Sequence, residues 1–252
     1  MQQRMSGRLV AFGVFATIAS AVACSSDSAG PSLSGSWHGF VVMHNEFGVP
    51  LTSDSGVVVT LSNNGHAGPS TVSSANGSYT FDGVHTGAYT LAYSGDAMGT
   101  FLRPEVAFVG GGTQFLGVEN FSTASTGTVT SLAATGIAGH DTLRVTGSIA
   151  APPAGLSRLV RLFFGSDTTV SAAPNAYMVS TSFKTSNGNL SVVITDTTLA
   201  NLRAAFGEGS PAFVVGYGDS FFTDSYVDTA TGNTVYPNVS ATPSNVVAFI
   251  VP

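Results

Sequence analysis

The chain has 252 residues, of which 43% are hydrophobic and 9% are charged, and its formal net charge is −6. So little charge beside so many aromatic residues excludes an intrinsically disordered chain. The absence of a basic patch excludes nucleic acid as a partner, because phosphate binding needs clustered Lys and Arg. The polar surface must come from Ser, Thr, Asn and Gly, a composition that suits β-strands and their turns.

The N-terminus has the pattern of an export signal. Arg4 and Arg8 precede an uncharged, mostly apolar run over 9–23. This run is shorter than the roughly 20 residues of a membrane-spanning helix, but it fits the apolar region of a signal peptide. We therefore expect a signal peptide over 1–23.

The end of this run resembles the lipobox of bacterial lipoproteins, in which small residues precede a lipidated cysteine. Here the residues are Ala21-Val22-Ala23-Cys24. The resemblance implies lipidation of Cys24, a flexible tether over 24–35, and membrane anchoring in a bacterial cell envelope, with the outer membrane as the expected site. The alternative is an ordinary thiol after an ordinary signal peptide. Cys24 is the single cysteine and has no partner for an intrachain disulfide.

Beyond Gly35 the apolar residues recur mostly with a period of two, which predicts strands. In chain order, strands are expected near 36–43, 56–61, 71–73, 78–81, 87–93, 106–109 and 113–118. The turns between them are expected at Asn76-Gly77, Asp82-Gly83 and Gly110-Gly111-Gly112, of which the first and last are interpreted as hairpin turns. This density of short strands predicts a small β-sandwich over 36–121.

Three segments of this block resemble the carboxypeptidase regulatory-like domain, a transthyretin-like sandwich. They are GVVVTL at Gly56–Leu61, ANGSYTF at Ala75–Phe81, and GAYTL at Gly87–Leu91. In that family the domain is an accessory module beside enzymes, transporters and surface proteins. The resemblance therefore implies a fold and no reaction.

A Ser/Thr-rich joint over 122–127 precedes a second block over 128–252, where strands are expected at 141–150, 159–164, 177–183, 190–195, 212–217 and 246–251. One helix is expected over 196–207, with Asp196 as N-cap and Gly207 as its stop. The block resembles an immunoglobulin-like or fibronectin type III-like sandwich. The predicted fold class is thus all-β: two tandem β-sandwiches with one short helix.

Catalytic motifs are missing from the sequence: it contains no HExxH, no H-x-x-E pair and no G-x-S-x-G elbow. We therefore expect a non-enzymatic lipoprotein without a cofactor, acting as a binding or structural module. Two alternatives stay open. One is a carbohydrate-binding module, and the other is a hydrolase of extracellular polymer whose site is assembled from residues distant in sequence.

Aromatic residues are dense over 217–236, and four of them are candidate contacts for a glycan or protein partner: Tyr217, Phe221, Phe222 and Tyr226. The alternative is that every second one belongs to the core. Phe221 and Phe222 cannot both point inward from a regular strand, so one is expected to be exposed, bulged or covered by a loop.

Three acidic residues of the same region, Asp219, Asp224 and Asp228, are candidate ligands for Ca²⁺, which prefers carboxylate oxygens. Their spacing does not match the Ca²⁺-binding loop D-x-[DN]-x-[DN]-G. The alternative interpretation is a solvated loop with acidic residues at its turns.

Overall fold

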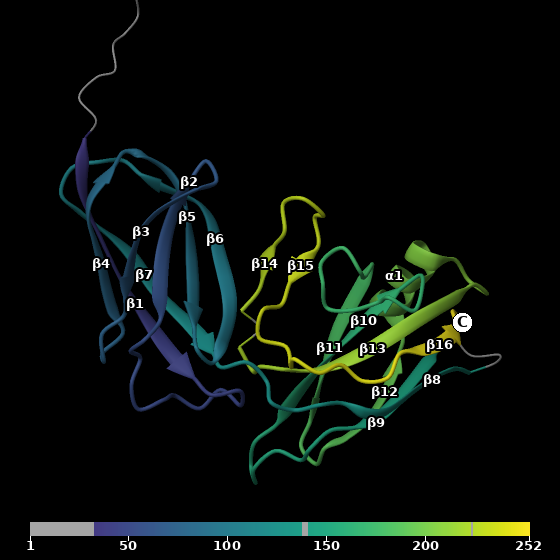
Figure 1. The fold of residues 1–252 in the computed structure, drawn as a ribbon. Helices are drawn as coiled ribbons and strands as arrows, with labels where there is room; N and C mark the ends of the chain where they lie inside the picture. Colours follow the sequence, from purple (N-terminus) through teal and green to yellow (C-terminus); the bar gives the residue numbers. More distant parts are fainter. Residues whose placement is uncertain (1–32, 138–140, 223) are drawn as a thin grey trace, which may run out of the picture. The chain divides into compact units, whose positions relative to one another are not determined.

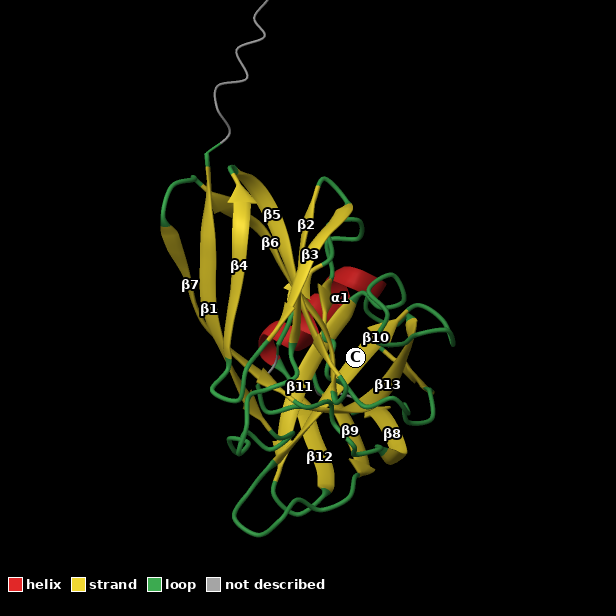
Figure 2. Cartoon of the chain, turned by 60° about the vertical axis from the view of Figure 1, so that its left-hand side comes forward, coloured by secondary structure: helices red, strands yellow, loops and turns green. Residues whose placement is uncertain are grey.

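The computed structural model describes residues 33–137, 141–222 and 224–252. The predicted signal peptide, Cys24 and most of the tether lie outside the described residues. Within the described ranges the chain forms the strands β1 to β16 and one helix, α1 (Figure 1 and Figure 2). The predicted all-β class is confirmed.

The strands before residue 123 form two sheets (Figure 1). The order in one sheet is β4 (Ser78–His85), β1 (Ser34–His44), β7 (Thr113–Ser122), and in the other it is β3 (His66–Val72), β2 (Val58–Asn63), β5 (Gly87–Gly95), β6 (Met98–Phe108). β1 and β7 run parallel, whereas the other pairs are antiparallel. The two sheets make a sandwich of three and four strands.

The core of this first sandwich is built from alternate residues of most of its strands, whereas β3 contributes no buried residue. Trp37 on β1 is fully buried and meets the rings of Tyr89 and Phe108 edge-on, with centroids 5.3 and 5.2 Å apart. On β5, Leu91 and Tyr93 are fully buried in the same cluster. Alternation along β5 therefore directs these two side chains into the core.

Two of the predicted hairpin turns are instead connections between the sheets. The turn at Asn76-Gly77 joins β3 of one sheet to β4 of the other, and Gly110-Gly111-Gly112 joins β6 to β7 in the same way. Positive φ angles are present at Gly77 (79°) and at all three glycines of the second connection (82°, 75° and 71°). Two-residue hairpin turns of this region lie at Asn64-Gly65, between β2 and β3, and at Asp96-Ala97, between β5 and β6.

Asp82-Gly83, predicted as a break between strands, lies inside β4 as a bulge. The register with β1 shifts between the pairs Gly35↔Val84 and Trp37↔Phe81. The Asp82 carboxylate accepts a hydrogen bond from the Ser36 hydroxyl at 2.7 Å, which ties the bulge to β1. Glycine at φ 68° lets the chain make this detour without ending the strand.

The strands after residue 129 form a second sandwich of three and four strands. One sheet has the order β12 (Asn189–Ile194), β9 (Leu143–Ser148), β8 (Thr130–Gly136), and the other has β11 (Val179–Thr185), β10 (Arg158–Gly165), β13 (Pro211–Asp219), β16 (Val247–Ile250). Because β11 pairs with β10, the four-stranded sheet differs from that of an immunoglobulin constant domain and matches the fibronectin type III-like alternative. A small hairpin, β14 (Tyr226–Val227) with β15 (Thr234–Val235), precedes β16.

Sequence patterns missed three strands and one long extension. β8, β14 and β15 were not predicted, and β6 begins at Met98 rather than near residue 106. β8 is made of small and polar residues, and β6 contains Arg103 and Pro104, so neither shows an alternation of large apolar side chains. Pairing with neighbouring strands, rather than local pattern, determines these elements.

β10 is buried along its whole length because both faces of its sheet are covered. Its inner face contributes Val160, Leu162 and Phe164 to the core, and its outer face packs Phe163 against residues of the surrounding loops. The helix α1 spans Asp196–Phe206, with Thr195 rather than Asp196 as its N-cap residue. It ends as predicted at Gly207, where φ is 86°.

Replacing Gly77 with alanine is predicted to destabilise the first sandwich by about 3–5 kcal/mol. The new Cβ would lie 2.0 Å from the Val41 carbonyl oxygen, and the residue would also be held at positive φ. Gly65→Ala is the matched control, because its φ is 78° but no atom lies within 4 Å of the added Cβ.

The control should lose about 1–2 kcal/mol in urea unfolding, which measures the backbone contribution alone. Equal losses in the two variants would contradict the close approach of Gly77 to β1.

Candidate functional site

Tyr217, one of the predicted ligand contacts, is a core residue. It lies on the covered outer face of β13 and is 7% exposed. Its ring meets Phe163 edge-on, with centroids 5.5 Å apart. Tyr217 therefore cannot present its ring to a ligand.

The other three predicted aromatic contacts follow β13 and have different surroundings. Phe221 is 40% exposed, and the Lys184 Nζ lies 4.5 Å from its ring centroid. Phe222 packs on the imidazole of His44, with ring centroids 4.3 Å apart. The ring of Tyr226 packs edge-on against Phe101. The structure thus exposes Phe221 but does not bring the four aromatics into one flat strip.

The three acidic residues proposed as calcium ligands have separate partners. The Asp219 carboxylate is buried and pairs with Arg161 Nε at 2.6 Å. Asp228 accepts a hydrogen bond from the Thr231 hydroxyl in an exposed turn. Asp224 accepts from the backbone N–H of Ser122. In the part of the chain that the structure describes, no group of three His, Cys, Asp or Glu residues is placed to hold a metal ion, so the predicted cluster does not form.

A second buried ion pair, which sequence reasoning missed, joins Glu46 to Arg158 with an N–O distance of 2.7 Å. The Glu46 carboxylate also accepts hydrogen bonds from the hydroxyls of Ser125 and Thr126 and from the backbone N–H of Thr126. Burial raises the pKa of Glu46, but the Thr126 bonds and the Arg158 charge outweigh burial and hold this pKa below its usual value. The cluster connects β10 with the segment after β7, and its role is structural.

Asp224 is the carboxylate whose protonation is most sensitive to its surroundings. Burial raises the pKa of Asp224 to about 7, although hydrogen bonds from Ser122 and Asn238 act in the opposite direction. The Asn238 amide also donates to the Ser122 carbonyl and accepts from the backbone N–H of Gly99. Asp224 therefore belongs to a polar network that holds three chain segments together.

The first exposed surface with a binding character is the outer side of the β4-β1-β7 sheet. We call it the aromatic face and define it as His38, Phe40, Phe115 and Val118. The rings of His38 and Phe40 meet edge-on at 4.8 Å, and Phe115 lies 5.9 Å from His38. Phe115 is 58% exposed and Val118 is 52% exposed. None of the four residues is Asp, Glu, Lys or Arg.

A β-bulge in β7 adds Val118 to this face. The pairing of β1 with β7 passes from His38↔Phe115 to Phe40↔Val118, so β7 contains one extra residue. In a regular strand, residues 115 and 118 would point to opposite sides. With Gly117 at φ 102°, both point outward while Leu116 remains buried. The alternation of β1 could have indicated His38 and Phe40, but no sequence pattern marked the bulge.

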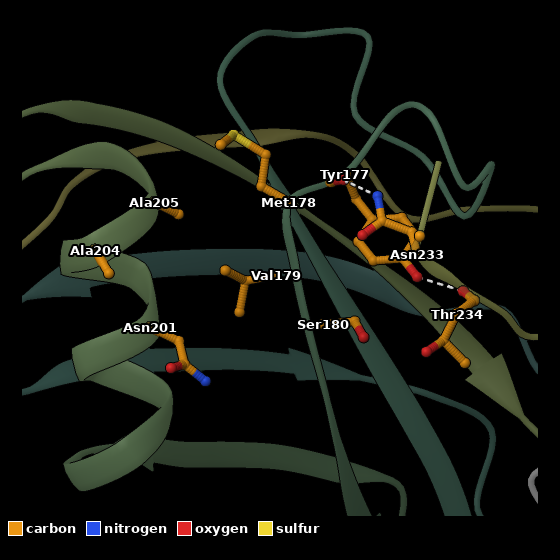
Figure 3. Close-up of a pocket in the computed structure, with 10 residues that line it drawn as sticks. Tyr177, Met178, Val179, Ser180, Asn201, Ala204, Ala205, Asn233 and Thr234 are labelled. Atoms are coloured by element: carbon orange, nitrogen blue, oxygen red, sulfur yellow. Dashed lines mark hydrogen bonds between the residues drawn. The ribbon is translucent and has the colours of Figure 1, made fainter. Parts of the chain in front are cut away.

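The second candidate is a groove of about 480 Å³ beside β11 (Figure 3). It is lined by Tyr177, Met178, Val179, Ser180, Asn201, Ala204, Ala205, Gly232, Asn233 and Thr234. None of these is Asp, Glu, His, Cys, Lys or Arg, and burial raises the pKa of Tyr177 to about 12. The lining therefore offers hydrogen bonds and apolar contact, without a group that transfers protons near neutral pH.

Comparisons with known proteins give limited information. No protein-family model and no curated protein matches the chain. Similar solved structures include a candidate carbohydrate-binding protein from Bacteroides uniformis, with 16% identity, TM-score 0.30, and coverage of 86% of this chain and 99% of that one. A DUF3823 family protein from Parabacteroides merdae has 10% identity, TM-score 0.31, and coverage of 86% and 99%.

The FN1–FN3 domains of chicken CNTN1 have 10% identity, TM-score 0.30, and coverage of 85% of this chain and 62% of that one. At these values the likenesses assign no function.

Over the described ranges, no helix has the length and hydropathy to cross a membrane.

Asp224→Asn is predicted to flatten the pH dependence of stability. The pKa of Asp224 in the folded protein, about 7, exceeds the ordinary aspartate pKa of 3.8. The folded protein therefore keeps a proton that the unfolded chain releases, and stability falls as the pH rises from about 4 to 7. Asparagine keeps an acceptor for Ser122 without carrying a charge, so the variant should gain about 1–3 kcal/mol at pH 8 and nothing near pH 4.

Urea unfolding of residues 25–252 at pH 4, 6 and 8 measures this difference. Asp96→Asn, in the exposed turn between β5 and β6, should leave the pH profile of the wild type unchanged. If the free energy of unfolding changed with pH in the same way for Asp224→Asn and the wild type, the raised pKa of the buried Asp224 carboxyl would be contradicted.

Proposed function

We propose that the chain is a non-enzymatic lipoprotein of a bacterial cell envelope that binds a partner through the aromatic face. The lipobox-like segment ending at Cys24 supports the anchor. The tether over 24–35 leads directly into β1, the strand that carries His38 and Phe40. A partner near the membrane would therefore be within reach of this surface.

The exposed ring cluster is the observation that carries the proposal. Interface centres in proteins are enriched in aromatic side chains and depleted in charged ones, and the aromatic face has that composition. Full burial of an exposed Phe side chain contributes about 1.5–3 kcal/mol, so covering the 58% of Phe115 that is exposed contributes about 1–2 kcal/mol to binding.

A glycan is the partner class that the neighbouring side chains favour. The β4 residues paired with His38 and Phe40 are Thr80 and Ser78, which places hydroxyl-bearing residues beside the rings. Sugars have apolar C–H faces and hydroxyl edges, and an exposed aromatic ring such as Phe115 with hydrogen-bonding groups nearby can contact both. This assigns carbohydrate binding to β1 and β7 rather than to the 217–236 aromatics.

Two further parts of the proposal concern organisation. We assign the segments 36–121 and 128–252 to separate domains, because their strands belong to different sheets. We also assign the first domain to the carboxypeptidase regulatory-like type, which acts as an accessory module. A hydrolytic function is less well supported, because the buried carboxylates of Glu46 and Asp219 each pair with an arginine.

The anchor is tested separately from the binding surface. In the bacterial host, the wild-type chain should incorporate a labelled fatty acid and enter the detergent phase. Cys24→Ser should do neither, because the thiol that accepts the lipid is gone. Fatty-acid labelling that persists in Cys24→Ser would contradict the lipobox assignment.

Phe115→Ala is predicted to weaken glycan binding by about tenfold or more, equal to about 1.4 kcal/mol. The test is affinity electrophoresis of the soluble fragment 25–252 in gels that contain isolated envelope polysaccharide. Phe221→Ala is the matched control, because Phe221 is 40% exposed but lies outside the aromatic face.

The control should migrate like the wild type. Loss of retardation in Phe221→Ala but not in Phe115→Ala would contradict binding by the aromatic face and favour a glycan site among the aromatics of 217–236. Retention by immobilised envelope protein instead of polysaccharide, lost in Phe115→Ala, would keep the surface and change the partner class.

A further inference from the structure

The floor of the groove in Figure 3 is an open sheet edge. β11 stands at the end of its sheet and pairs only with β10. The structure gives the backbone of residues 179–184 no hydrogen bonds to described residues other than those of this pairing. Alternate N–H and C=O groups along the other edge of β11 are therefore available to a further strand.

Two elements flank this edge, as Figure 3 shows, and we call them the walls of the groove. The helix α1 presents Asn201, Ala204 and Ala205 on one side, and the β14–β15 hairpin contributes residues 232–234 on the other. The side chains of Val179 and Ser180 point to opposite sides of β11, as expected for a strand seen along its edge.

Both walls are fixed before any ligand arrives. Asn233 Nδ2 donates to the carbonyls of Pro174 and Tyr177, and the Tyr177 hydroxyl donates to the carbonyl of Thr234. On the other side, Leu199 and Leu202 hold α1 in the core. A preformed groove lowers the entropic cost of ordering loops on binding.

We propose that this groove binds an extended polypeptide segment, which adds to β11 as a further strand. Backbone hydrogen bonds along the edge would supply affinity, and the side chains of the segment would enter the space left by the small residues Ala204, Ala205 and Gly232. The helix and the hairpin flank residues 177–180, so a strand that pairs with this part of the edge would lie between them.

Charge further defines the segment. Lys184, the one lysine of the chain, lies on β11. It is four residues after Ser180, so the two side chains lie on the same side of the strand. Among the described residues it makes no ion pair, and its Nζ lies over the ring of Phe221. The groove lining itself carries no charge. The preferred segment therefore alternates small or apolar residues with polar ones, lacks proline at its centre, and has an acidic residue at the end nearest Lys184.

This binding site is independent of the proposed anchor and of the aromatic face. It uses the second sandwich alone and needs neither Cys24 nor Phe115. Failure of glycan binding or lipidation would leave it intact, and Phe115→Ala should not change it.

The test selects from a phage-displayed library of random seven-residue peptides against the fragment 25–252. Ala204→Phe fills the groove with a ring at an exposed helix position. Ala200→Phe is the matched control, since Ala200 is also exposed on α1 but does not line the groove. Selected peptides are then synthesised, and their dissociation constants are measured for all three proteins.

The expected result is a family of alternating peptides whose affinity falls at least tenfold in Ala204→Phe and is unchanged in Ala200→Phe. Amide hydrogen exchange in the complex should slow at residues 179–184. Circular dichroism of Ala204→Phe should match the wild type, and Asn201→Phe, which fills the groove from a second exposed position on α1, should reproduce the loss. Selection of no peptide, or of peptides that bind Ala204→Phe and Asn201→Phe as well as the wild type, would overturn the proposal.

Discussion

The structure depends on one constraint: along most strands, every second side chain must enter a core between two sheets. Trp37, Leu91 and Tyr93 satisfy it in the first sandwich, and Val160, Leu162 and Phe164 satisfy it in the second. With 9% charged residues, the chain has few groups that would mark its outer surface by charge. The candidate binding sites on that surface therefore lie where a strand departs from the regular alternation of inward and outward side chains or from regular pairing.

Two such departures shape the two candidate sites. The extra residue in β7 brings Val118 to the same side as Phe115, beside His38 and Phe40, which regular alternation along β1 already places there. At the edge strand β11, the helix and the hairpin stand beside the sheet without pairing with it, and a groove remains. The buried ion pairs of Arg158 and Arg161 serve a different purpose, since they neutralise carboxylates inside the protein.

The sequence predicted the all-β class, most strands and the end of the helix, because these depend on local alternation and on glycine. It did not predict sheet membership. Asn76-Gly77 has the composition of a hairpin turn but connects two sheets, since which strands pair depends on contacts far apart in the chain. The candidate site was predicted less well. Tyr217 belongs to the core because loops cover the outer face of its sheet. The patch around Phe115 was not predicted, because no sequence pattern marks the bulge that turns Val118 to the same side.

Photocrosslinking in intact cells tests the central claim most directly. A photoreactive amino acid is placed at position 115, or at position 221 for comparison, in the full-length chain, and the envelope is illuminated. The account predicts a crosslinked adduct from position 115 that carries glycan and is absent from position 221. An adduct from position 221 alone, or none from position 115, would contradict the assignment of the aromatic face as the binding surface.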